Sequence, residues 1–217
     1  MSTRSSEAPS KRGRQAEARR NDLAVLEAAR DVFSVFGAGA SVAAVAERAG
    51  VGMGTLYRRY GSKTELLQRL CMLAMEQARQ AAQEALAAED PWAGLAGYIR
   101  TCVELRSGAL APLAGQIETT PQMRALSREG RDLVDEIVAR ARDAGSLRPD
   151  VTGLDIAWLI EQFSRRTPDA VDPREEARVR ARLLAIALDG LRAPGADPLP
   201  GWPPSRAHYE GRWRQSS

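Results

Sequence analysis

The stretch from Ser41 to Lys63 constrains this chain most strongly, because two short helical patterns flank a glycine-centred turn within it. Ser41 is a suitable N-cap, and apolar residues recur at helical spacing over residues 42–49. Gly50 can adopt the left-handed conformation that ends a helix, and residues 53–60 then form about two further turns. Two short helices joined by a tight turn that contains glycine predict a helix-turn-helix.

Helical patterns on both sides extend this unit. Residues 22–36 carry an apolar stripe along one face, so a first helix is expected to pack on the two short ones. Ser62 followed by Glu65 forms a capping-box pattern that opens a long helix, expected to end near residue 88. We therefore predict a three-helix unit, joined to the rest of the chain by a helix that can transmit movement.

The remainder of the chain has helical periodicity, without the alternation or the hairpin signals of strands. The predicted fold class is therefore all-α, with an N-terminal three-helix domain and a C-terminal helical bundle. Further helices are expected at about 91–106, 109–117, 121–144, 152–166 and 173–192. Four parts are expected: a disordered basic arm (1–20), a helix-turn-helix domain (21–61), a helical domain (62–192) and a flexible proline-rich tail (193–217).

The distribution of charge bears on the kind of partner. The net charge is +3, but residues 1–70 carry twelve Lys/Arg against seven Asp/Glu, a local charge of +5 that leaves −2 for the remainder. A basic excess around a helix-turn-helix is what a phosphate-binding domain needs. The arm of residues 1–20 is either a solvated tail or a segment that reaches the DNA backbone or minor groove.

Several classes of protein are disfavoured. No run of about 18 apolar residues and no apolar N-terminal segment occurs, so neither a transmembrane helix nor a secretory signal is expected. Cys71 and Cys102 lie in helical patterns and match no metal-ligand spacing, which favours a reducing cytoplasm. His208 is the single histidine, and no phosphate-cradling loop or nucleophile elbow is present. We expect no enzyme activity, no cofactor and no metal site.

The string Ala46–Lys63, together with the preceding segment Ala28–Gly37, carries a resemblance to a known family. Through these motifs, residues 21–70 resemble the TetR family of bacterial transcriptional regulators. The resemblance implies a homodimer on a roughly palindromic operator, with one recognition helix in each major groove and a C-terminal domain that holds a small effector. Typical members repress transcription and release DNA when the effector binds, whereas some members activate.

The resemblance also places candidate DNA contacts. Tyr57 can offer its hydroxyl to a phosphate and its ring to a thymine methyl, and Lys63 lies where a helix N-terminus can hold a phosphate. Met53 stands where a polar or basic residue is commoner, and Ala43 is too short to bond a base, so operator shape is expected to contribute. Alternatively, Tyr57 and Tyr60 mainly pack the core. The candidate contacts are Ser41, Val42, Met53, Gly54, Thr55, Tyr57, Arg58, Arg59, Tyr60 and Lys63.

The C-terminal domain offers large and polarizable side chains for an effector cavity, although such residues at helical spacing also suit a plain core. A buried Glu104, Arg106, Gln116 or Glu118 would orient a polar ligand. The candidate ligand-binding residues are Trp92, Tyr98, Cys102, Met123 and Trp158.

The last two expected helices, 152–166 and 173–192, are apolar over most of their circumference and should be buried, which suits a four-helix interface between two copies. A helical-bundle interaction protein without DNA binding is the remaining alternative. The candidate interface residues are Leu154, Trp158, Leu183, Leu184, Ala187, Leu188 and Leu191.

Overall fold

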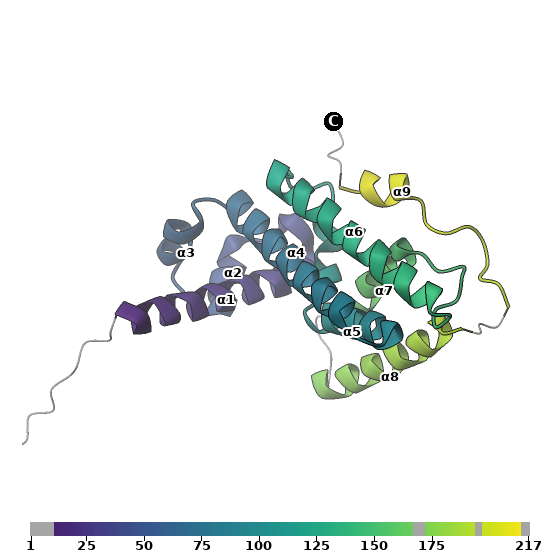
Figure 1. Cartoon of the computed structure of the whole chain (residues 1–217). Coiled ribbons are helices and arrows are strands. Elements are labelled where there is room, and N and C mark those ends of the chain that lie inside the picture. The colour runs from purple at the N-terminus through teal and green to yellow at the C-terminus, as the bar shows by residue number, and fades with distance from the viewer. Residues whose placement is uncertain (1–10, 167–171, 194–196, 214–217) are drawn as a thin grey trace, which may run out of the picture.

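The computed structural model describes residues 11–166, 172–193 and 197–213. Within these residues, helices joined by loops form the fold, and one isolated bridge pairs Leu147 with Arg192 (Figure 1). The prediction of an all-α fold is confirmed. The helices are α1 (Lys11–Phe36), α2 (Val42–Ala49), α3 (Met53–Tyr60), α4 (Lys63–Ala87), α5 (Pro91–Glu104), α6 (Pro121–Asp143), α7 (Gly153–Ser164), α8 (Pro173–Leu191) and α9 (Arg206–Gly211), with short 3-10 helices η1 (Gly37–Gly39) and η2 (Ser107–Leu113).

The ends of the short helices follow the local signals in the sequence. The Ser41 hydroxyl accepts a hydrogen bond from the amide of Ala44 at the start of α2, and Gly50 ends α2 in the left-handed conformation with φ 66°. Ser62 accepts a hydrogen bond from the amide of Glu65, which starts α4. These caps fix both ends of α2 and the start of α4, and so hold the recognition helix α3 between them, as the helix-turn-helix pattern predicts.

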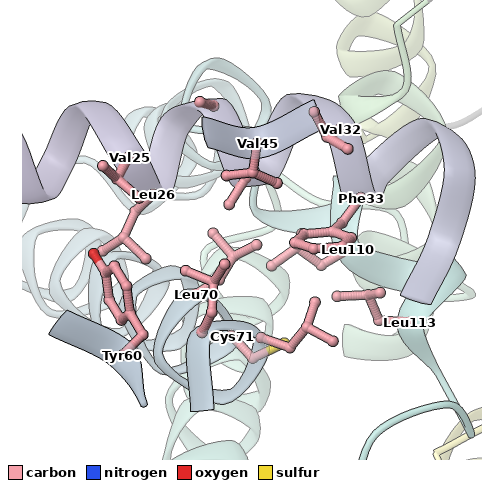
Figure 2. Packing of buried hydrophobic residues seen from close by; sticks show 14 of the residues in the cluster. Val25, Leu26, Val32, Phe33, Val45, Tyr60, Leu70, Cys71, Leu110 and Leu113 are labelled. Atoms are coloured by element: carbon pink, nitrogen blue, oxygen red, sulfur yellow. The ribbon is translucent and has the colours of Figure 1, made fainter. Parts of the chain in front are cut away.

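The first hydrophobic core joins the helix-turn-helix to the C-terminal domain. Phe33 and Val45 are fully buried between α1, α2 and α4. Figure 2 shows that Leu110 and Leu113 of η2 lie in the same core beside Phe33. Met123 of α6 also belongs to this core. The expected boundary near residue 61 therefore divides the chain by motif but does not separate two independent cores.

A second core holds the C-terminal helices together. It includes side chains from the second half of α4 and from α5, α6, α7 and α8. Gly94 permits the close approach of α5 to α4, because a Cβ there would lie 2.5 Å from the carbonyl oxygen of Ala85. The backbones of α4 and α5 therefore pack in close contact.

Three segments differ from the expectations. The helix expected at 109–117 is the 3-10 helix η2, which contains Pro112 and ends at Leu113. The first helix α1 begins at Lys11, so residues 11–20, expected to be part of a disordered arm, are helical. Their Arg, Gln, Ala and Glu residues have high helix propensity and extend a helix that is already nucleated by packing farther along. The expected flexible tail contains the short helix α9. Residues 1–10, 194–196 and 214–217 lie outside the described residues.

Candidate DNA-binding face and ligand cavity

One face of α3 is exposed and carries most of the candidate DNA contacts. Met53, Gly54, Thr55 and Arg58 are exposed, and the side chain of Tyr57 is 43% exposed. Leu56, on the opposite face, is buried in the first core. The helix has no side-chain N-cap, because Gly52 precedes it. An exposed short helix without a side-chain cap at its N-terminus and with basic residues in its last turn has the form that phosphate and base contacts require.

Two of the candidate DNA contacts have buried side chains. Tyr60 is only 7% exposed, and its hydroxyl donates to an oxygen of Asp22 on α1. Burial, together with this bond, raises the pKa of Tyr60. The Val42 side chain is buried in the first core. The alternative interpretation, that Tyr60 packs the core, is therefore correct, whereas Tyr57 points outward.

The remaining basic candidates lie at the C-terminal end of α3 and the start of α4. Arg59 makes an ion pair with Asp22, its Nε lying 2.7 Å from the carboxylate oxygen. The ammonium of Lys63 lies 5.9 Å from the centre of the Phe33 ring and remains partly exposed. Ser41 is exposed, and its hydroxyl accepts from Ala44, so its own proton is available to a phosphate.

A cavity of about 660 Å³ opens among α4, α5, η2, α6, α7 and the C-terminal segment, residues 205–213, which contains α9. Of the five candidate ligand residues, Tyr98 and Met123 line it. Burial raises the pKa of Tyr98 well above its usual value, so its phenol stays neutral. Apolar side chains of α4, η2 and α6 form part of the cavity lining. The apolar residues include Ala74, Met75, Ala78, Leu110, Met123 and Leu126.

Three candidate ligand residues lie elsewhere. Trp92 stacks under the guanidinium of Arg192, 4.9 Å from the ring centre. Cys102 is buried in the second core, and burial raises its pKa to about 11. Trp158 is covered by the C-terminal segment. Helical periodicity shows that such residues face inward, but not which of them face a void.

The C-terminal segment supplies cavity residues that sequence reasoning missed. Arg206, Tyr209, Glu210 and Trp213 all line the cavity. The signal available in the sequence was Ser205, a good N-cap ahead of closely spaced aromatic residues, which the proline content nearby obscured. The wall of the cavity is therefore completed by residues far along the chain from the bundle.

A network of charged side chains joins the cavity wall to the helix-turn-helix. Arg106, at the start of η2, is buried and adopts φ 55°. Its guanidinium bonds to Asp31 of α1 and, at 3.0 Å, to the Ser34 hydroxyl. Asp31 also accepts a hydrogen bond of 2.8 Å from Arg48 of α2. Although burial opposes it, hydrogen bonding from the two arginines holds the pKa of Asp31 below its usual value.

Arg106 was a candidate for orienting a ligand, and it instead points away from the cavity, into this network. The next two residues, Ser107 and Gly108, line the cavity. A Cβ on Gly108 would lie 2.5 Å from the Cα of Glu161, so η2 and α7 touch through their backbones. The start of η2 therefore lies between the cavity and Asp31 of α1.

The expected interface residues on α8 divide into two faces. Leu184, Leu188 and Leu191 are buried in the second core of their own chain, so the single chain already covers these side chains. Leu183 is 50% exposed, and Ala187 is half-buried. The exposed apolar stripe of α8 consists of Val179, Leu183 and Ile186.

The candidates on α7 have other surroundings. Leu154 is half-buried and lines the cavity. Trp158 packs against the C-terminal segment. Within the described ranges, no group of three or more His, Cys, Asp or Glu could hold a metal ion, and none of the helices is long and apolar enough to cross a membrane.

A trihelical unit with an exposed recognition helix, packed on a helical bundle that contains a cavity, defines the class of helix-turn-helix proteins with a helical ligand-binding domain. A family model described as "Bacterial regulatory proteins, tetR family" matches residues 25–70. A second, described as "Transcriptional regulator SbtR-like, C-terminal domain", matches residues 90–193. The chain belongs to the TetR family of bacterial transcriptional regulators.

Solved structures of similar proteins agree with this assignment. The TetR transcription regulatory protein from Mycobacterium vanbaalenii is 28% identical over 82% of this chain and 99% of its own, with a TM-score of 0.55. The TetR transcriptional regulator SCO0520 from Streptomyces coelicolor is 24% identical over 79% and 98%, with a TM-score of 0.53. The TetR-like regulator LfrR from Mycobacterium smegmatis, in complex with proflavine, shares the fold at 21% identity over 84% and 99%, with a TM-score of 0.61. No curated protein matches the chain.

Proposed function

We propose that this protein is a transcriptional repressor that binds a palindromic operator as a homodimer and leaves it when a small effector enters the cavity. The observation that carries the proposal is the sharing of one core by the cavity and the helix-turn-helix. Cys71 and Met123 line the cavity and also pack in the core that supports α3. An effector that moves these side chains cannot leave the spacing of the two recognition helices unchanged.

The operator contacts proposed are Thr55, Tyr57 and Arg58 on the exposed face of α3, with Ser41 and Lys63 at the flanking helix ends. Tyr57 is the proposed base reader, because its ring and hydroxyl are free of the core. Lys63 and Ser41 are proposed to hold phosphates and so to fix the register of α3 in the major groove.

DNA binding is tested by fluorescence anisotropy with a labelled duplex from upstream of the protein's own gene and an unrelated duplex, at several salt concentrations between about 50 and 200 mM. Tyr57→Ala should weaken binding to the specific duplex about tenfold, the loss of one good base contact. Lys63→Ala should weaken both duplexes and reduce the salt slope by about 1. Arg178→Ala, which removes an exposed cation from α8, is the matched control. Equal affinity for both duplexes at every salt concentration would refute the regulator proposal.

The proposed dimer contact is the apolar stripe of Val179, Leu183 and Ile186 on α8. These residues are exposed in the single chain, and their spacing of four and three places them on one helical face. Leu183→Glu should shift the mass measured by light scattering at micromolar concentration toward the monomer. Ala185→Glu adds the same charge at an exposed position off the stripe and should leave the dimer intact. A wild-type chain that scatters as a monomer would contradict this interface.

A further inference from the structure

The segment 205–213, which contains α9, closes one side of the cavity. Figure 1 shows α9 lying beside α6, far from the recognition helix. Ser205 caps the segment by accepting a hydrogen bond from the amide of His208. Four of its nine residues line the cavity, so the segment is part of the wall that a ligand would meet.

The segment is fastened to α7 through a buried carboxylate. Glu161 is 3% exposed and accepts two hydrogen bonds, of 3.1 and 2.9 Å, from the guanidinium of Arg212. The same guanidinium lies 4.0 Å from the centre of the Trp158 ring, and Tyr209 meets that ring edge-on with 6.0 Å between centres. These contacts form an anchor at the end of the segment.

A second attachment to α6 involves a cation in the cavity wall. Arg131 Nη2 lies 3.4 Å from the carboxylate of Glu210. Its Nη1 donates to the Ser127 hydroxyl at 2.8 Å, while its buried Nε has no hydrogen-bond partner in the described part of the chain. Arg131 is thus a half-satisfied cation, which Glu210 contacts loosely. Arg206 adds a solvent-exposed pair with Asp135 at 3.2 Å.

The cavity lining combines apolar surface with cations. Met75, Leu110 and Met123 are among its apolar residues, and Arg131 is one of its arginines. Glu210 brings a carboxylate to that cation, and Tyr209 and Trp213 bring apolar surface to the same cavity. The segment therefore places a carboxylate and apolar side chains at the cavity, as a bound apolar molecule with a carboxylate would.

Building on the proposed effector role of this cavity, we infer that segment 205–213 is a displaceable internal competitor, and that the effector is an apolar molecule with one carboxylate. The ligand's carboxylate takes the place of Glu210 on Arg131, its apolar body packs against the apolar lining residues, and α9 leaves the cavity wall. The ligand binds only molecules in which the segment is open. Its apparent association constant is therefore the intrinsic constant multiplied by the fraction of open molecules. Arg131 sets the preference for an anion, and Glu210 sets the threshold concentration.

The experiment uses the full chain and two carboxylates of different shape, decanoate below its micellar concentration and 1-naphthylacetate, each compared with its alcohol. Isothermal titration calorimetry measures affinity. Glu210→Gln should bind the acids about fivefold more tightly, because a partly exposed ion pair no longer holds the segment closed. Arg131→Met should reduce the preference for acid over alcohol at least tenfold. Glu76→Gln makes the same change in an ion pair with Arg69, neither partner of which lines the cavity, and should leave both values unchanged.

Release of the segment has its own readout. Trypsin cleaves after Arg206 and Arg212, and mass spectrometry should detect faster cleavage at both sites when decanoate is bound. Cleavage after the exposed Arg178 of α8 should be unchanged and serves as the internal reference.

Failure of both acids to bind, or equal affinity of the wild type and Glu210→Gln, would overturn the inference. Neither readout contains DNA, so these outcomes would leave the regulator proposal standing. Loss of operator binding with both readouts intact would refute the regulator proposal alone.

Discussion

Replacing Asp31 by asparagine removes the carboxylate that ties the cavity wall to the helix-turn-helix. Asp31 bonds Arg106, whose side chain is 9% exposed, and Arg48, which is largely exposed. Breaking a buried pair by removing one partner costs about 3–5 kcal/mol, because the other charge stays buried. Asp31 is 30% exposed, and Arg106 keeps its 3.0 Å bond to Ser34, so solvent and this bond reduce the cost. We expect the free energy of unfolding to fall by about 2 kcal/mol.

Urea denaturation followed by circular dichroism measures this difference, and thermal unfolding should show a midpoint lower by about 4–8 °C. The control is Asp135→Asn, whose ion pair with Arg206 is more than half exposed at both partners and is worth at most about 0.5 kcal/mol. If Asp31→Asn were no more destabilising than Asp135→Asn, Arg106 would not depend on Asp31 in solution. The coupling proposed between cavity and DNA-binding domain would then lose its charged link.

The same pair has a defined pH dependence. Hydrogen bonding from Arg106 and Arg48 lowers the pKa of Asp31 in the folded chain, so the folded state binds the proton less readily than the unfolded state. The resulting stabilisation is complete above the ordinary pKa of aspartate, about 4, and is lost as the pH falls through the lower folded-state value. The stability difference between wild type and Asp31→Asn should be constant near neutrality and shrink only in acid.

Two further predictions concern the contact between η2 and α7 and the hydrogen bonds of Asp150. Gly108→Ala should lower the free energy of unfolding by about 1–3 kcal/mol, because its Cβ would collide with the α7 backbone. Gly97→Ala, where a Cβ has open space, is the control and should be neutral or stabilising. Equal effects of the two substitutions in urea denaturation would contradict the close contact at Gly108. The Asp150 carboxylate accepts hydrogen bonds from Arg148 and from the amide of Leu199, and its pKa falls to about 2, so its stabilisation is present above about pH 4 and disappears as the pH falls through 2. A carboxyl carbon titration by NMR with a midpoint near 4 would show that these bonds do not persist in solution.

Local sequence signals were sufficient to predict the DNA-binding unit. Ser41, Gly50 and Ser62 act within one turn of the positions that they cap, so their effects need no knowledge of the rest of the fold. The helix-turn-helix pattern and the family motif in residues 46–63 identified the same unit as the family comparison. Periodicity likewise predicted the long helices α4 and α6, because the apolar stripe of a helix can be recognised from that segment alone.

Which side chain on a helix faces the core was less predictable. Tyr57 and Tyr60 look equivalent in the sequence, yet Tyr57 is exposed while Tyr60 is buried and bonded to Asp22, 38 residues earlier. On α8, the adjacent residues Leu183 and Leu184 have opposite environments. When a helix such as α8 is apolar all round, its sequence does not indicate which face packs against its own chain. That face depends on how α8 crosses the other helices.

The sequence by itself determined the helices, their caps and the reading unit, because hydrogen bonds and propensities within a few residues favour these structures. Only the tertiary structure decided where the cavity lies and what closes it. Arg212 meets Glu161 across 51 residues of sequence, and Arg106 meets Asp31 across 75. No local pattern encodes such pairs, since they form only when packing brings distant helices together and the loss of solvent makes each buried charge require its partner.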